Sequence, residues 1–315
     1  MEPGPRSRLH SLLRHLQPHL QPASSGIYGI VPACITPAFA EPVRGSAVRP
    51  KLRELLGVEH LPGAGGVSLL ETARGDEPDG VSWRKGTFEN VLGDSVPAIV
   101  LLPTSSAAAA PLLPGVVCVP GTGGSAEETA DARLSNAPDD GQVFGWGREL
   151  VRRGFAVVTL TVFGCTARNL GFPGRWDQQT KYLTSYGRPP MGIIAEETYR
   201  AARLLAADPR VDPGRIGVCG MSLGGLASWY SAAIDDAEGV YKAVAPVCGG
   251  LGSAAVNIAQ GHPDRASNAM FPPFLLRHFD HDTIVRDASE CQLPDPHGYM
   301  TCVHHPLLKR AVFMS

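Results

Sequence analysis

The chain carries a serine between glycines in the stretch Gly220-Met221-Ser222-Leu223-Gly224-Gly225. An apolar run, 215–219, precedes this stretch, and a helix-like segment, 226–234, follows it. The order predicts a strand, a sharp turn with Ser222 at its tip, and a helix. A serine at such a tip adopts a strained backbone conformation, and neighbours without side chains allow the turn to close.

This turn predicts a reactive hydroxyl. It lifts the Ser222 side chain out of the sheet and directs the N-terminus of the next helix at it, where unpaired N–H groups and partial positive charge suit a developing oxyanion. We therefore predict a nucleophile elbow, with Ser222 as the catalytic residue of a serine hydrolase. The pattern could also arise by chance among 36 glycines, or the turn could cradle a phosphate. A dinucleotide site fits poorly, because glycines 217, 220, 224 and 225 do not form Gly-x-Gly-x-x-Gly.

A second glycine-rich loop supports the first. The apolar run 116–119 ends in Pro120-Gly121-Thr122-Gly123-Gly124-Ser125, and an acidic, helix-friendly stretch begins at Ala126. Acyl transfer needs two backbone N–H donors, one from the residue after the nucleophile and one from the loop after an earlier strand. Leu223 and Thr122 are the candidates for this oxyanion hole. The alternative is an ordinary loop between a strand and a helix, and no Gly-Lys-Ser/Thr follows to make it a P-loop.

Composition bounds the class of protein. A chain of 315 residues can bury one large α/β core or two small ones. Its net charge of −2 gives no electrostatic case for nucleic acid or an anionic membrane as a partner. The cysteines at positions 34, 118, 165, 219, 248, 291 and 302 contain no Cys-x-x-Cys pair, so neither a disulfide framework nor a metal site is indicated. Buried free thiols in a reducing compartment are the expected state.

The N-terminal segment is unlike the rest of the chain. Residues 1–40 lack the apolar core of a secretory signal, and no stretch reaches the roughly 18 apolar residues of a membrane span. Leucines 9, 12, 13, 16 and 20 fall on one helical face, which favours a helix docked on the body over an organelle transit peptide. We expect a cytoplasmic protein in which 22–50 forms an irregular wrap.

From about residue 67 the pattern alternates regularly. Strands are expected at 67–73, 81–88, 98–102, 116–119, 155–163, 215–219 and 240–247, and helices at 142–153, 192–207 and 223–234. Early antiparallel strands followed by strand–helix alternation predict an α/β fold with a doubly wound, mostly parallel sheet. The aromatic segment 165–190 is expected as a long loop above the carboxyl ends of the strands, where ligands bind.

The chain resembles the α/β-hydrolase superfamily, and within it the acetyl-xylan-esterase-like and dienelactone-hydrolase-like group. The resemblance rests on 120–124, on 208–218, on the serine turn and on 242–249, and 273–280 resembles the helix before the family's next strand. It spans about 65–285, and Pro120 replaces the family's usual histidine. It implies hydrolysis of small carboxylic esters through an acyl-serine, without metal or cofactor.

The family pattern breaks after the serine turn, where a strand ending in Asp and a later strand followed by His are expected. Neither follows, so the acid and base remain unknown and the last strands are expected to be missing. By analogy with the family, Asp280 and Asp282 come too early in the chain. The available groups, each expected to be a solvated loop residue, are Asp264, Asp287, Asp295, His281, His297, His304 and His305. His304 and His305 beside Cys302 lack a third metal ligand at suitable spacing. The tail 286–315 could be an alternative or frame-shifted end.

Three functions stay open at this point: an esterase using Ser222, a catalytically impaired hydrolase-fold protein that binds a ligand or partner, and a peptidase of the same fold. We divide the chain into an N-terminal helix and wrap (1–65), a hydrolase domain (66–285) and an atypical tail (286–315). The substrate's acyl and alcohol groups and the oligomeric state are not encoded in any of these motifs.

Overall fold

The computed structural model describes residues 47–63, 65–104, 111–131, 145–164, 168, 176–235, 239–247, 249, 272–281 and 283–284. The predicted helix at 9–20 and the tail 286–315 lie outside these residues, as does most of the predicted wrap at 22–50. The division of the chain at 65 and 285 stays a prediction.

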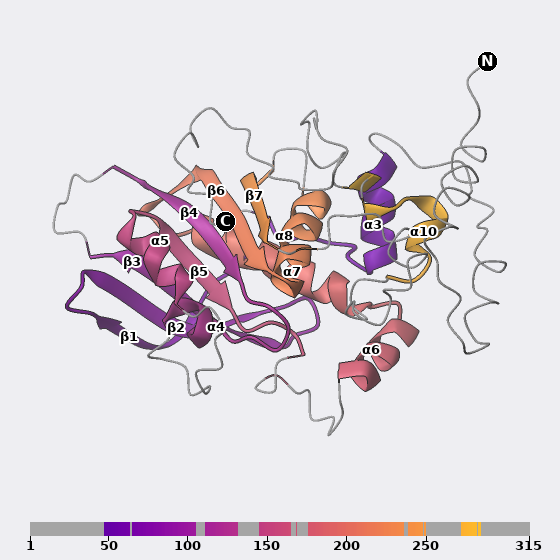
Figure 1. Cartoon of the computed structure of the whole chain (residues 1–315), viewed down its shortest axis with the longest axis horizontal. Helices are drawn as coiled ribbons and strands as arrows, with labels where there is room; N and C mark the ends of the chain where they lie inside the picture. The colour runs from indigo at the N-terminus through magenta and orange to yellow at the C-terminus, as the bar shows by residue number, and fades with distance from the viewer. Residues whose placement is uncertain are drawn as a thin grey trace, which may run out of the picture.

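One seven-stranded sheet forms the centre of the molecule, in the order β1-β2-β3-β5-β4-β6-β7 (Figure 1). Its strands are β1 Leu70–Asp76, β2 Val81–Glu89, β3 Ser95–Pro103, β4 Leu113–Val119, β5 Ala156–Leu160, β6 Val211–Met221 and β7 Tyr241–Val247. The first three strands pair antiparallel, as does β3 with β5, whereas β5, β4, β6 and β7 are parallel neighbours. The predicted fold class, a mostly parallel sheet with antiparallel strands at its N-terminal edge, is confirmed.

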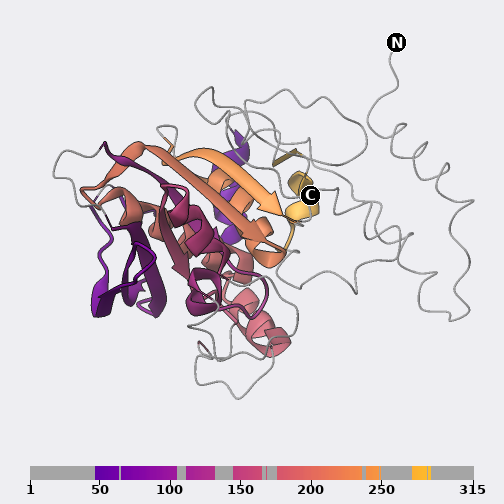
Figure 2. The same ribbon diagram turned by 60° about the vertical axis from the view of Figure 1, so that its left-hand side comes forward.

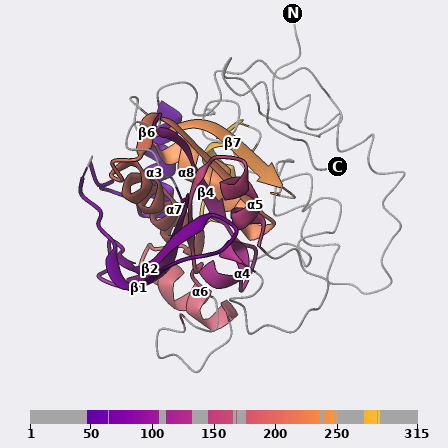
Figure 3. The same cartoon turned by 90° about the vertical axis from the view of Figure 1, so that its left-hand side faces the viewer.

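Helices cover both faces of this sheet (Figure 3). They are α3 Val48–Leu56, α4 Ala126–Ala130, α5 Trp146–Arg152, α6 Trp176–Ser185, α7 Pro190–Ala206, α8 Leu223–Ile234 and α10 Leu275–His278. We name the two faces after their helices: α7 and α8 contact β4 to β7 on the α7–α8 face, and α4 and α5 contact β2, β3 and β5 on the α4–α5 face. None of the helices among the described residues combines the length and apolar character that a bilayer crossing requires.

The two faces bury different cores. On the α7–α8 face, alternate strand residues such as Val100, Val117 and Val158 join α3, α7 and α8 in one large apolar cluster. On the α4–α5 face, Cys118 and Val157 join a much smaller cluster beneath the two short helices. The period-two alternation along the strands separates the clusters, because neighbouring strand residues point to opposite faces.

Two helices were missed by the sequence analysis. Helix α3 buries Val48, Leu52 and Leu56 against the α7–α8 face, and Pro50 lies within its first turn, where proline is tolerated. Helix α6 occupies part of the segment predicted as a long loop; it projects from the body of the molecule (Figures 1 and 2). Two aromatic residues of that segment, Tyr182 and Tyr186, belong to the α6 region and are exposed.

The parallel strands set the position of the site. Because β4, β5, β6 and β7 run the same way, their carboxyl ends meet at one edge of the sheet, where ligands bind in open α/β sheets. The loops after Val119 and Met221 therefore lie side by side.

Candidate active site

Ser222 stands alone between a strand and a helix, as predicted. Strand β6 ends at Met221 and α8 begins at Leu223, and between them Ser222 has φ 56° and ψ −116°. Among the described residues other than glycine, only Ser222 and Phe274 have positive φ. Such a conformation costs about 1–3 kcal/mol and persists where the surroundings hold it in place, often at functional sites.

Backbone hydrogen bonds hold this turn on both sides. The Ser222 N–H donates to the carbonyl oxygen of Val247 at the end of β7 (2.8 Å), and the Leu226 N–H donates to the carbonyl oxygen of Ser222 (3.1 Å). Ser222 itself is exposed, whereas Leu223 beside it is buried. The turn is thus fixed by β7 and by the first turn of α8, while the serine side chain stays at the surface.

The glycines beside Ser222 allow β4 and α8 to approach each other. A Cβ on Gly224 would overlap the carbonyl oxygen of Val119, and a Cβ on Gly220 would lie 2.8 Å from the same oxygen. Real side chains do not make contacts this short with backbone atoms. The glycine spacing that predicted the turn therefore has a steric cause in the contact between the end of β4 and the start of α8.

The loop after β4 borders the serine. A Cβ built on Gly121 would lie 3.7 Å from the Ser222 Cβ and 3.5 Å from the Met221 carbonyl oxygen. The Gly124 N–H donates to the Gly121 carbonyl (3.0 Å), and Gly123 has φ 77°, so the loop closes as a tight turn. Thr122, at its tip, is exposed.

The loop after β4 ends at the N-terminus of α4, which hydrogen bonds hold in place. Ser125 and Glu128 form a reciprocal capping box, with the Glu128 N–H donating to Ser125 Oγ at 3.2 Å and the Ser125 N–H donating to Glu128 Oε2 at 3.0 Å. The Ala126 N–H donates to the buried Thr161 Oγ1 at 3.0 Å. These bonds satisfy the first amides of a helix only one turn long, and they fix where the loop ends.

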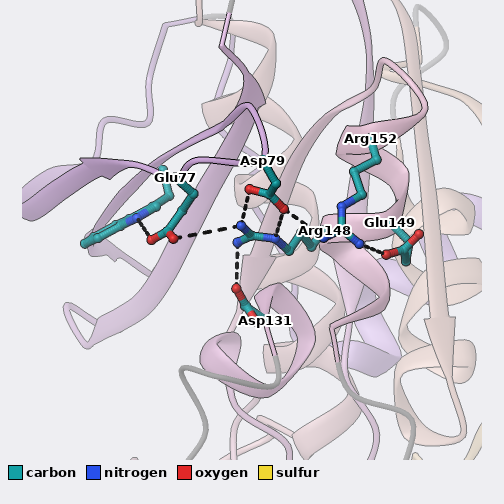
Figure 4. A network of polar contacts seen from close by, with 7 residues as sticks. Glu77, Asp79, Asp131, Arg148, Glu149 and Arg152 are labelled. Carbon is teal, nitrogen blue, oxygen red and sulfur yellow. Dashed lines mark hydrogen bonds and ion pairs between the residues drawn. The ribbon is translucent and has the colours of Figure 1, made fainter.

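An arginine holds the other end of α4 (Figure 4). Arg148 of α5 forms an ion pair with Asp131 after α4 (2.6 Å) and a bidentate ion pair with Asp79 in the β1–β2 turn. Arg152 also donates to Asp79 (2.8 Å). The hydrogen bond from Arg148, with help from Arg152, lowers the pKa of the Asp79 carboxyl to about 2. The cluster ties the hairpin, α4 and α5 together.

A second, fully buried ion pair lies on the α7–α8 face and was not predicted. Arg168 Nη1 and Nη2 contact the two oxygens of Glu197, each at 2.7 Å, and Asn90 Nδ2 donates to Glu197 Oε1 at 2.8 Å. The side chains of the arginine and the glutamate are 3 % and 0 % exposed. Glu197 lies three residues after Ile194 and four before Ala201, so an acid on the inward helical face was the available signal.

The histidines among the described residues are His60, His278 and His281, and none of them is joined to Ser222 by a hydrogen bond. His281 Nε2 contacts the Tyr230 hydroxyl (3.1 Å), and its ring meets the edge of Trp229 at 5.1 Å. Tyr230 is eight residues along α8 from Ser222, about 12 Å along the helix axis. His281 is therefore a buried packing residue, and the expectation that it is solvated was wrong. Burial, and then Lys51 of α3, lowers the pKa of His278, and His60 is exposed after α3.

Among the acids and bases considered from the sequence, Asp280 is the other one that lies within the described residues. Asp280 is partly buried and accepts a hydrogen bond from the N–H of His281 (2.6 Å). The remaining candidates lie outside the described residues: Asp264, Asp282, Asp287, Asp295, His297, His304 and His305. Within the described residues, no group of three or more His, Cys, Asp or Glu side chains is arranged to hold a metal ion.

Comparison with known proteins identifies the fold. No protein-family model matches the chain. "Putative hydrolase YtaP" from Bacillus subtilis (strain 168) is 29% identical over 163 residues, which are 50% of this chain and 50% of that protein. The chain thus spans about half the length of the curated relative it matches.

The chain is similar to several solved structures, including the following two. A protein described as a putative acetyl xylan esterase from Bacteroides fragilis NCTC 9343 has a TM-score of 0.56 at 16% identity, covering 85% of this chain and 74% of its own. A glucuronoyl esterase from Solibacter usitatus has a TM-score of 0.47 at 16% identity, covering 79% and 76%. From the first of these likenesses and the seven-stranded sheet described above, we conclude that the chain has the α/β-hydrolase fold.

Proposed function

We propose that this protein is a serine hydrolase that cleaves small carboxylic esters, with Ser222 as its nucleophile. The observation that carries the proposal is the exposed serine with a strained, positive-φ backbone, at the junction of β6 and α8 and beside the loop at Gly121. The similarity to a protein named as a putative hydrolase and the fold shared with a protein described as a putative acetyl xylan esterase support it.

In the proposed reaction the Ser222 Oγ attacks the carbonyl carbon of the ester while its proton passes to a general base. Charge collects on the carbonyl oxygen, and the N–H groups of Leu223 and Thr122 are the proposed donors to it. The first amides of a helix have no partner inside the helix, which leaves the Leu223 N–H available. The tetrahedral intermediate expels the alcohol, and water then releases the acid from the acyl-serine.

Whether a general base reaches Ser222 distinguishes the esterase from a catalytically impaired hydrolase-fold protein. Within the described residues, no hydrogen bond joins Ser222 Oγ to a histidine, so we propose that a base, if the chain supplies one, comes from outside them. A serine site without base and acid keeps only oxyanion and binding contributions, roughly 10³–10⁴-fold over water. The chain would then bind an ester-like ligand without rapid turnover.

A fluorophosphonate probe tests the proposal directly. It labels only activated serine hydroxyls, so the folded chain should be labelled at Ser222 and the Ser222→Ala variant should not. Ser185→Ala, which removes an exposed serine hydroxyl on α6, is the matched control and should label like the parent. Absence of labelling in folded parent protein would contradict the esterase and favour the binding protein.

A substrate comparison separates esterase from peptidase. We expect p-nitrophenyl acetate to be hydrolysed faster than a prolyl anilide, as the proposed esterase function implies. The reverse preference would favour a peptidase. We further propose a cytoplasmic location and a small-molecule ester as the partner, without nucleic acid, and cell fractionation would check the location.

A further inference from the structure

Two cysteines face each other across the centre of the sheet. Cys118 on β4 and Cys219 on β6 are partners in the register of two parallel strands, and both are free thiols. Their sulfur atoms are 3.9 Å apart. Cys118 lies two residues before Pro120 and Cys219 three before Ser222, so the pair lies directly behind both loops of the candidate site.

The backbone geometry suits a covalent bond between them. Neighbouring strands lie about 4.8 Å apart, inside the range of about 4.4–6.8 Å between the Cα atoms of disulfide-bonded cysteines. The sulfur atoms must close from 3.9 Å to about 2.05 Å. Rotation of the two side chains supplies most of this movement, because the strands are already hydrogen-bonded in register.

The two thiols differ in access to solvent. Cys219 is partly exposed and packs against the apolar cluster on the α4–α5 face. Cys118 is fully buried, and this burial, together with the neighbouring Cys219 thiol, raises its pKa well above its usual value. Cys219 is therefore the thiol that a small dissolved reagent meets first, and Cys118 is the second thiol within its reach.

We propose that Cys118 and Cys219 form an oxidant-sensitive pair, which a small peroxide converts to a disulfide between β4 and β6. The Cys219 thiol gives up its proton and the thiolate attacks one oxygen of hydrogen peroxide, so that the O–O bond breaks. The departing hydroxide takes up that proton, and a sulfenic acid and one water result. The Cys118 sulfur then attacks the Cys219 sulfur, the S–O bond breaks, and the departing hydroxide leaves as a second water with the Cys118 proton. Two thiols are oxidised by two electrons, and one peroxide is reduced to two waters.

The consequence of the bond is local. The strands are already neighbours, so the disulfide would not change the pairing of the sheet but would tie the strand before Pro120 to the strand before Ser222. The pair does not depend on the proposed esterase function, because any chain with this sheet would place the two thiols together.

Peptide mapping of the full-length protein tests the proposal. The reduced chain is treated with hydrogen peroxide, remaining thiols are blocked under denaturing conditions, and the protein is digested with trypsin without reduction. Cys118 and Cys219 are each the single cysteine of their tryptic peptides, 86–133 and 216–242, so the link is unambiguous. We expect one linked pair, lighter than the sum of both peptides by two hydrogens, that replaces most of the unlinked peptides and disappears on reduction.

Cysteine variants, and oxidation products other than the linked pair, test whether Cys118 and Cys219 form the disulfide. Cys219→Ser, at the partly exposed position, should abolish the linked pair, as should Cys118→Ala. If the buried Cys118→Ala variant does not fold, the parent and Cys219→Ser suffice for the test. Oxidation of Cys219 to sulfinic or sulfonic acid without a link to Cys118, linkage of either cysteine to another cysteine, or no reaction would each overturn the proposal.

Discussion

The α7–α8 face and the α4–α5 face of the sheet differ in how completely helices cover them and in how deeply their ion pairs are buried. Three helices seal the α7–α8 face with one large apolar cluster, and its ion pair between Arg168 and Glu197 is fully buried. The α4–α5 face has a small cluster under two short helices, and its cluster around Arg148 reaches the partly exposed Asp79. Where a face is sealed, protein atoms must satisfy every polar group, whereas water can replace a lost partner on the open face.

The largest difference between the faces should follow from removing one charge of the sealed pair. In Glu197→Ala the buried guanidinium of Arg168 loses the carboxylate opposite it, and Asn90 loses an acceptor. We expect the free energy of unfolding to fall by about 3–5 kcal/mol. Urea denaturation followed by circular dichroism measures this loss.

The double variant Arg168→Met, Glu197→Leu is the control, because replacing a whole buried ion pair by apolar side chains is often close to neutral. It should recover most of the stability lost in Glu197→Ala. A single variant as stable as the parent would mean that the α7–α8 face is not sealed around this pair.

On the α4–α5 face the corresponding change should cost less. Arg148→Ala removes the ion pair with Asp131 and the contact with Asp79, but water reaches Asp79, whose side chain is 30 % exposed. We expect a loss of about 1.5–3 kcal/mol in the same urea experiment. Arg152→Ala, which removes a half-exposed arginine from the same cluster, should cost less than about 1 kcal/mol. If Arg148→Ala lowered the free energy of unfolding as much as Glu197→Ala does, the expected difference between the two faces would be contradicted.

Features that depend on residues close together in the chain could be predicted from the sequence. The strand–serine–helix turn was predictable because its signal is local: glycines on both sides of Ser222 and an apolar run before it. Helix α8 begins and ends at the predicted residues, Leu223 and Ile234. The parallel arrangement of the later strands followed from strand–helix alternation, whereas their order in the sheet was not predicted.

Pairings between distant residues were not predictable. Arg168 lies in a segment without regular pattern, and only the fold brings it to Glu197. Helix α3 was missed because Pro50 was taken as part of an irregular wrap, although Leu52 and Leu56 have helical spacing. The roles of Ser222, Thr122 and Leu223 remain predictions, since geometry alone does not establish reactivity.

Two buried threonines on the α4–α5 face allow a hydrogen-bonded hydroxyl to be compared with one that lacks a partner among the described residues. Thr161 Oγ1 accepts from the Ala126 N–H, whereas Thr159 Oγ1, equally buried, has no hydrogen-bond partner among the described residues. Valine has nearly the same shape as threonine. We expect Thr161→Val to lower the midpoint of thermal unfolding, at a cost of about 1 kcal/mol, and Thr159→Val to leave it unchanged or raise it. Equal losses in both variants would show that the Thr159 hydroxyl has a partner after all.

The smallest effect should come from pH, and it tests whether the open face depends on Asp79. Because the hydrogen bond from Arg148 lowers the Asp79 pKa to about 2, the folded state binds its proton less readily than the unfolded chain, whose value is near 4. The contribution of Asp79 is therefore fully present above about pH 4 and is lost as pH falls toward about 2. Urea midpoints of the parent and of Asp79→Asn should differ by a constant amount near neutral pH and converge as the solution is acidified. Glu54→Gln, which alters an exposed ion pair on α3, is the control and should show no such convergence. A gap between the parent and Asp79→Asn that persisted to about pH 2 would mean that the asparagine destabilises the hairpin through its shape rather than its lost charge.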